Sequence, residues 1–107
     1  MSQERLVVIA EIRAARGRES AVKELLLGLV PKTREETGCL QYDLHESEEE
    51  PGLFWFYEQW TSRAALDEHL RMPYIQEMVT QADILLAASP RIVLCRKLNG
   101  PGQPVPS

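Results

Sequence analysis

The sequence lacks most of the marks of metal, nucleotide and redox-cofactor proteins. Its 107 residues include only two cysteines and two histidines, and Cys39 and Cys95 do not form a CxxC pair. A metal site needs three or four converging ligands, and two lone histidines are weak evidence for one. There is no GxGxxG motif, no P-loop and no nucleophile elbow. We therefore predict no metal site and no bound cofactor.

The chain also lacks an excess of basic residues and any long apolar run. Its net charge is −4, whereas a nucleic-acid binder or a polybasic membrane anchor would show a basic patch. The apolar run LVVIA near the start has five residues, too few for a signal peptide. No window approaches the roughly 18 apolar residues of a membrane span. We expect a cytoplasmic protein with reduced thiols and with neither nucleic acid nor membrane as a partner.

What the chain does contain is ordinary globular composition, with 44% apolar and 26% charged residues. That length and composition suit one domain with a modest core. We assign residues 1–98 to this domain. The remaining residues, 99–107, form a tail rich in proline and glycine that cannot build a core and is expected to be flexible.

The pattern of apolar residues predicts four strands and two helical regions. Strands are expected at 6–13, 39–47, 54–60 and 91–98, and helices at 18–37 and from the Thr61-Ser62 cap to about residue 86. Pro31 should kink the first helix or split off its last turn, and Gly38 fits the C′ position. Met72-Pro73 should divide the second region, whose later part should direct inward the apolar residues Ile75, Met78, Val79 and Ala82.

The resulting order, β-α-β-β-α-β, is that of a ferredoxin-like α+β fold. Such a fold has a four-stranded antiparallel sheet with helices on one face. Its second and fourth strands lie at opposite edges, several spacings of about 4.8 Å apart. Cys39 and Cys95 would sit on those two strands, too far from each other for a disulfide.

The stretch LFWFYEQW, 53–60, is bulky and apolar on both faces of its predicted strand. Because strand side chains alternate, Trp55 and Tyr57 must point away from Phe54 and Phe56. Helices can cover only one of these faces. The other would form an apolar patch larger than a monomer usually exposes, so we predict a homodimer that packs sheet against sheet.

Four segments in order resemble the antibiotic biosynthesis monooxygenase family. They are VIAEIR at 8–13, EETGCLQYDLHES at 35–47, FYEQW at 56–60 and ALDEHLRMPY at 65–74. The chain is most similar to the small quinol monooxygenases of that family. The resemblance implies a dimeric α+β barrel and cofactor-independent oxygenation of a quinol or polyhydroxylated aromatic by molecular oxygen.

The resemblance does not extend to the haem-degrading branch of the family. That branch uses an Asn on the first strand and a Trp and a His on the second helical region. Ile12, His69 and Val79 fall near those positions here. Two further functions stay open: isomerisation or breakdown of a small oxygenated metabolite, and non-catalytic binding of a small ligand by the dimer.

His69 and Glu58 are the candidate catalytic residues. His69 shares a helix face with Leu66 and suits proton abstraction near neutral pH. The same pattern also fits a structural histidine at the edge of the core that donates one hydrogen bond. Glu58 shares a strand face with Trp60 and must be paired or partly wet. It can orient His69 or a substrate hydroxyl, or it can have a structural role in a salt bridge or a hydrogen bond to the backbone.

The candidate substrate-binding residues are Phe54, Phe56, Trp60, Leu66 and Tyr42. Trp60, at the end of its strand, is more typical of a packing residue than of an electron relay, and Tyr42 can equally supply dimer contacts.

Overall fold

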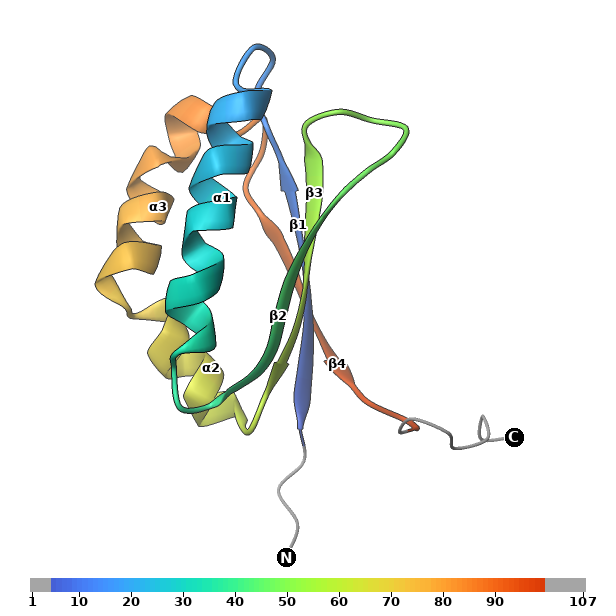
Figure 1. Cartoon of the computed structure of the whole chain (residues 1–107), viewed down its shortest axis with the longest axis vertical. Helices are drawn as coiled ribbons and strands as arrows, with labels where there is room; N and C mark the ends of the chain where they lie inside the picture. The colour runs from blue at the N-terminus through green and yellow to red at the C-terminus, as the bar shows by residue number, and fades with distance from the viewer. Residues whose placement is uncertain (1–4, 100–107) are drawn as a thin grey trace, which may run out of the picture.

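The computed structural model describes residues 5–99, which fold as β-α-β-β-α-α-β (Figure 1). The elements are β1 (Leu6–Arg13), α1 (Glu19–Arg34), β2 (Cys39–Glu46), β3 (Leu53–Trp60), α2 (Arg63–Leu70), α3 (Pro73–Leu85) and β4 (Arg91–Arg96). The predicted α+β ferredoxin-like class is confirmed, as is the division of the second helical region at Pro73. Of the predicted tail, only Asn99 lies among the described residues.

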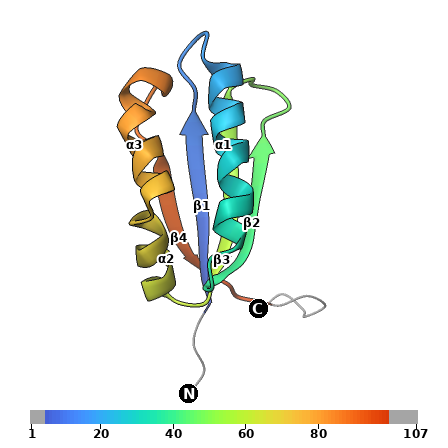
Figure 2. The ribbon, with the colours of Figure 1, turned by 60° about the vertical axis from the view of Figure 1, so that its left-hand side comes forward.

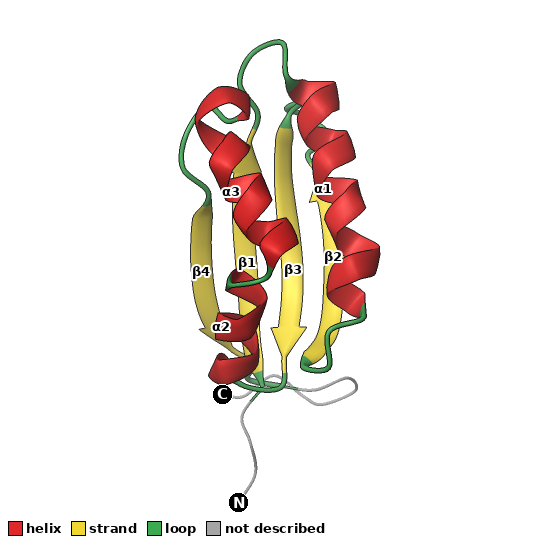
Figure 3. Cartoon of the chain, turned by 90° about the vertical axis from the view of Figure 1, so that its left-hand side faces the viewer, coloured by secondary structure: helices red, strands yellow, loops and turns green. Residues whose placement is uncertain are grey.

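The sheet has the order β2-β3-β1-β4, and every neighbouring pair is antiparallel. Figures 2 and 3 show the three helices on one face of it, with α1 toward the β2 edge and α2 and α3 toward the β4 edge. As predicted, β2 and β4 are the two edge strands. Cys39 and Cys95 are both free thiols in this arrangement.

The core lies between the helices and the covered face of the sheet. Val8, Ala10 and Ile12 from β1 face the helices, as do Phe54 and Phe56 from β3. The buried residues of α1 recur at steps of three and four, which makes one stripe along the helix: Val22, Leu26, Leu29 and Thr33. Each buried aliphatic or aromatic side chain of this kind contributes about 1.5–3 kcal/mol, so the layer contact is the main source of stability.

The opposite face of the sheet carries no helix in the part of the chain that the structure describes (Figure 1). Ile9 remains 40% exposed there, and Trp55 and Tyr57 are partly exposed. The predicted alternation of β3 is therefore confirmed. Its even-numbered residues lie under the helices, and its odd-numbered ones lie on this open face.

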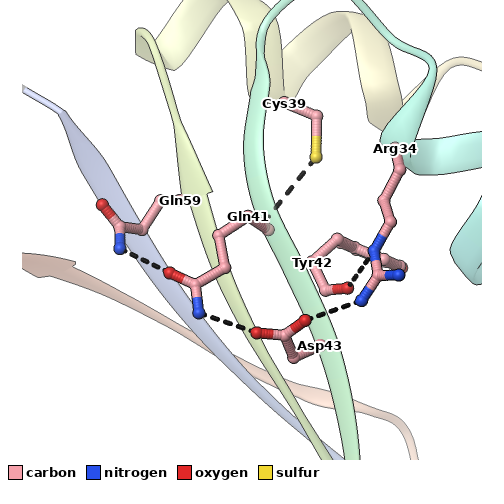
Figure 4. Close-up of polar contacts among 6 residues, drawn as sticks. All are labelled: Arg34, Cys39, Gln41, Tyr42, Asp43 and Gln59. Atoms are coloured by element: carbon pink, nitrogen blue, oxygen red, sulfur yellow. Dashed lines mark hydrogen bonds and ion pairs between the residues drawn. The ribbon is translucent and has the colours of Figure 1, made fainter.

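A row of polar side chains crosses the open face near the β2 edge (Figure 4). Gln59 donates to Gln41 at 2.6 Å, and Gln41 donates to Asp43 at 2.7 Å. Arg34 then reaches Asp43 at 2.7 Å from the end of α1. The side-chain oxygen of Gln59 is buried and accepts no hydrogen bond. This row gives the open face a polar border beside its apolar centre.

The first helix differs from the prediction at its end. It stops at Arg34 rather than near Thr37, and it runs through Pro31 for three more residues without being split. Gly38 is not a left-handed C′ residue, because the described glycines with positive φ are Gly17 and Gly52. A Cβ on Gly38 would lie 2.3 Å from the Cβ of Ala65. Gly38 is needed for close packing of the turn against α2.

The remaining differences are small. The last strand ends at Arg96 instead of Leu98, and α3 ends at Leu85. Val79, predicted to point inward, is 55% exposed although it borders a cavity. The N-cap prediction is confirmed, because the Ser62 hydroxyl accepts a hydrogen bond from the backbone N–H of Ala65 at 3.2 Å. None of the described helices is long and apolar enough to cross a membrane.

Candidate active site

A cavity of about 130 Å³ lies between the helices and the covered face of the sheet. Its walls come from all seven elements or their flanking residues and are almost entirely aliphatic or aromatic. The polar groups that reach it are those of Tyr42, Glu58 and His69. An apolar pocket with a few converging polar groups is the usual form of a small-molecule site, which makes this cavity the candidate active site.

His69 lies in the last turn of α2 and is 3% exposed. The Ser62 cap fixes where α2 begins, and Leu66 and His69, three residues apart, share its buried face. The imidazole packs against the indole of Trp60, with 4.6 Å between ring centroids, and meets the edge of the Tyr42 ring at 5.6 Å. Aromatic walls therefore hold the imidazole at the cavity.

Glu36 is the hydrogen-bond partner of His69, at 2.8 Å from Nδ1. It lies in the turn after α1, where its backbone N–H donates to Thr33 and its carbonyl accepts from Cys39. The Tyr74 hydroxyl, from the first turn of α3, donates to the same carboxylate. Three segments far apart in sequence thus meet in one partly buried polar cluster.

Glu58 faces the cavity from β3 and is 5% exposed. Burial raises its pKa to about 7. The hydrogen bond from the Trp60 indole at 2.9 Å opposes this rise in pKa, and the nearby charge of Glu36 adds to it. The sequence left open whether Glu58 orients His69. In the structure the Glu36 carboxylate is hydrogen-bonded to His69, whereas the Glu58 carboxylate accepts a hydrogen bond from Trp60.

Tyr42 lines the cavity from β2 and stacks on Phe56, with ring centroids 4.5 Å apart. Burial raises the pKa of its hydroxyl far above the ordinary value for tyrosine. The hydroxyl therefore stays protonated and can act only as a neutral hydrogen-bonding group.

Four of the predicted site residues come together at the cavity: Tyr42, Phe56, Glu58 and His69. The other three, Phe54, Trp60 and Leu66, are buried in the core and do not border it. Among the residues the structure describes, no three His, Cys, Asp or Glu side chains cluster in a way that could hold a metal ion.

Glu36 and Tyr74 were not predicted as site residues. Glu36 was placed inside a helix that was expected to run to residue 37, and Tyr74 directly follows the helix-breaking Pro73. The only available signal was the turn chemistry of Gly38, which follows Glu36 by two residues. Nothing in a single sequence indicates that Glu36 and His69, 33 positions apart, form a pair.

Comparisons with known proteins agree with this architecture. The model of the antibiotic biosynthesis monooxygenase family matches residues 5–81. A Mycobacterium tuberculosis protein named as a candidate monooxygenase is 34% identical over 94 residues, which are 88% of this chain and 92% of that protein. An uncharacterized Synechocystis protein is 35% identical over 82 residues, which are 77% of this chain. Those residues span 56%, about half, of the Synechocystis protein.

The structural likeness is equally extensive. The crystal structure of a Pseudomonas aeruginosa protein superposes with a TM-score of 0.87 and 34% sequence identity. The superposition covers 92% of this chain and 99% of the other. Since the family model spans more than two thirds of the chain and these relatives share about a third of its residues, the chain belongs to the antibiotic biosynthesis monooxygenase family.

Proposed function

We propose that the chain is a monooxygenase of a quinol or polyhydroxylated aromatic and that it works without a bound cofactor. Its family and the name of its Mycobacterium relative support a monooxygenase. One observation carries the choice of substrate and mechanism. Two titratable residues, His69 and Glu58, border one small cavity whose other walls are apolar apart from Tyr42.

His69 is the base in this proposal. It takes the proton of a substrate hydroxyl, so that the O–H bond breaks and its electron pair stays on oxygen. An electron-rich aromatic anion of this kind can pass one electron directly to molecular oxygen. The two radicals then combine, which forms a bond between a ring carbon and oxygen. The apolar walls exclude water during these steps and strengthen the electrostatic interactions inside.

Glu58 supplies the proton for the last step. His69 first returns its proton to the outer oxygen, which gives a hydroperoxide. Loss of water then breaks the O–O bond and the C–H bond of the same ring carbon. The leaving oxygen takes the Glu58 proton, the C–H proton passes to His69, and the C–H electron pair forms the C=O bond. A carboxyl group with a pKa of about 7 holds its proton about half of the time near neutral pH and can therefore donate it. One oxygen atom ends in the product and the other in water. The quinol supplies all four electrons, so no external reductant is needed.

The size of the cavity fits an aromatic substrate. Its volume of about 130 Å³ is close to the roughly 150 Å³ of an apolar cavity that accommodates benzene. Tyr42 and Phe56, stacked at the wall, present aromatic surface to a planar ring. A single-ring quinol, or one ring of a larger substrate, is the size of ligand that this space favours.

We further infer that the active form is a homodimer, with the open faces of the two sheets packed together. Ile9, Trp55 and Tyr57 leave apolar surface exposed on this face, which a second copy would bury. A cytoplasmic location stays a prediction from the sequence.

Oxygen uptake with a panel of reduced benzoquinones, reduced naphthoquinones and anthrones tests the proposed reaction. We expect uptake well above the spontaneous rate, and a loss of about 100-fold or more in His69→Gln, since a general base contributes about 10²–10⁴-fold. Glu48 is exposed in the loop between β2 and β3, away from the cavity, so Glu48→Gln is the control and should retain full activity. Uptake at the spontaneous rate with every substrate would refute the proposal. Turnover without oxygen would indicate an isomerase.

A further inference from the structure

His69 lies between two different compartments. The residue lines the apolar cavity, whereas its Nδ1 lies 2.8 Å from Glu36. Glu36 does not border that cavity. It borders a second, outer pocket of about 360 Å³, whose lining includes the charged or polar residues Lys32, Glu68 and Tyr74. The Glu36–His69 pair therefore spans the wall between an apolar interior and an outer polar surface.

The contact with Glu36 determines which ring nitrogen carries the hydrogen. An ionised carboxylate only accepts hydrogen bonds, so the Nδ1 that faces it must be the donor. A neutral imidazole then has a bare lone pair on Nε2. In water a histidine side chain prefers the opposite tautomer, with the hydrogen on Nε2. Glu36 thus reverses the intrinsic preference and leaves Nε2 as the basic nitrogen.

Tyr74 holds Glu36 in place for this contact. Its hydroxyl donates to the carboxylate oxygen that also faces His69. Burial, together with this bond to Glu36, raises the pKa of Tyr74 to about 12, so the hydroxyl keeps its proton and remains a donor. The Lys32 ammonium lies over the Tyr74 ring, 5.6 Å from its centroid. Tyr74 and His69 thus hold the Glu36 carboxylate through one shared oxygen.

We propose that Glu36 is a positioning residue, which holds His69 in the tautomer that leaves Nε2 free to accept the substrate proton. This role rests on the proposed function. When the substrate O–H bond breaks, an N–H bond forms at Nε2 and the Nδ1–H bond stays. The imidazolium that results lies beside the Glu36 carboxylate, which stabilises its positive charge. Glu36 itself does not touch the substrate.

The first test is the tautomer of His69, read from the nitrogen chemical shifts of its neutral imidazole. The chain has one other histidine, His45, which is exposed and serves as the internal reference. We expect the Nδ1–H form in the wild type and in Glu35→Gln, a matched control because Glu35 borders the same outer pocket. Glu36→Leu should shift His69 to the Nε2–H form. An Nε2–H wild type, or an unchanged Glu36→Leu, would overturn the proposal.

The second test is kinetic and uses the oxygen-uptake assay. Glu36→Gln keeps the shape and can still accept from Nδ1 but loses the charge, so kcat should fall about 10-fold with KM little changed. Glu36→Leu should lose about 100-fold, at the lower end of what a general base contributes. Glu35→Gln should stay within about twofold of the wild type.

The two tests separate failure of this inference from failure of the proposed function. If the wild type oxidises no quinol, the proposed function fails and the tautomer result alone decides the role of Glu36. If Glu36→Leu does not fold, the kcat of Glu36→Gln decides it. A kcat equal to that of Glu35→Gln in either Glu36 variant would overturn the inference.

Discussion

The indole Nε1 of Trp60 donates a hydrogen bond of 2.9 Å to Glu58, two residues earlier on the same strand. Alternate residues of a strand share a face, so the two side chains are adjacent under the helices. Trp60 is fully buried and Glu58 nearly so. This single neutral donor does not offset the loss of water around the carboxylate, and the pKa of Glu58 is raised from 4.5 to about 7.

The raised pKa of Glu58 predicts a loss of stability as the pH rises. Between about 4.5 and about 7 the folded chain keeps a proton that the unfolded chain has lost, so the free energy of unfolding decreases across this range. The full decrease is about 3 kcal/mol, since one pKa unit corresponds to about 1.4 kcal/mol. Urea unfolding followed by tryptophan fluorescence at pH 5 and pH 8 measures it.

The matched variants for this prediction are Glu58→Gln and Glu48→Gln. The glutamine in Glu58→Gln cannot ionise but can still accept a hydrogen bond from Trp60. Its free energy of unfolding should therefore equal that of the wild type at pH 5 and exceed it by about 3 kcal/mol at pH 8. Glu48 is exposed in the β2–β3 loop, and Glu48→Gln should follow the wild type at both values. If Glu58→Gln is less stable than the wild type at pH 8, the carboxylate is better paired than its contacts indicate.

Two glycines predict opposite effects of the same substitution. An alanine at Gly38 would place its Cβ 2.3 Å from Ala65, so Gly38→Ala should destabilise the fold by about 1–3 kcal/mol. Gly28 lies on the exposed side of α1 with nothing within 4 Å of a new Cβ. Gly28→Ala should therefore stabilise the chain by about 0.5–1 kcal/mol, because alanine favours the helix.

Urea unfolding of both variants checks this prediction. The double variant Gly38→Ala with Ala65→Gly removes the clashing methyl group and should recover part of the lost stability. If Gly38→Ala is as stable as the wild type, the turn and α2 can move apart without loss of stability, and the close contact is not needed.

Local patterns account for most of the fold that the sequence predicted. The strands were recognisable because their apolar residues are β-branched or aromatic, and Ser62 and Pro73 mark helix starts by their own chemistry. The end of α1 was not recognisable from the sequence, since Glu36 and Thr37 are compatible with either a helix or a turn. The close approach of Gly38 to Ala65, which lie 27 positions apart, requires a glycine in this turn, and a local pattern cannot show such a contact.

The candidate site was less predictable than the fold, for a physical reason. Periodicity showed that Glu58 and His69 point toward the layer between helices and sheet. It could not show which side chains border a cavity there, because that depends on how far apart the layers pack. Trp60 and Leu66 fill the layer, whereas Tyr42 and Phe56 border the space that remains. The Glu36–His69 pair depends on a turn whose position was itself predicted wrongly.

The order of the strands predicts the behaviour of the two thiols. Cys39 and Cys95 lie on opposite edge strands and are both free, so titration of the unfolded chain without reductant should give two thiols. Burial raises the pKa of Cys39 to about 11, and its alkylation at pH 8 should be slow because little thiolate is present. Cys39→Ser should abolish this slow phase. A monomeric species with fewer than two thiols would contradict the strand order.

The open face of the sheet predicts the effect of a charge at Trp55. This residue lies opposite Glu11 of β1 and His45 of β2 and stays partly exposed. Because Trp55 is already partly buried in one chain, a second copy can cover only a fraction of the roughly 150–250 Å² of such a side chain. That fraction is worth about 1–2 kcal/mol at about 25 cal/mol per Å² before ordering costs. A lysine there would put a charge into an apolar interface, so Trp55→Lys should be monomeric or unfolded at micromolar concentration, where the wild type sediments as a dimer.

Leu27 provides the matched control for Trp55, because it is a large apolar residue that is 51% exposed on α1, far from the open face. Leu27→Lys removes similar exposed apolar surface and should remain dimeric. Sedimentation velocity of the three proteins, with circular dichroism to verify folding, separates the outcomes. A wild type with the mass of one chain would refute the dimer. A folded, dimeric Trp55→Lys would show that the copies meet elsewhere, since a contact over Trp55 would have to bury the lysine ammonium together with the neighbouring Glu11 carboxylate, which costs affinity.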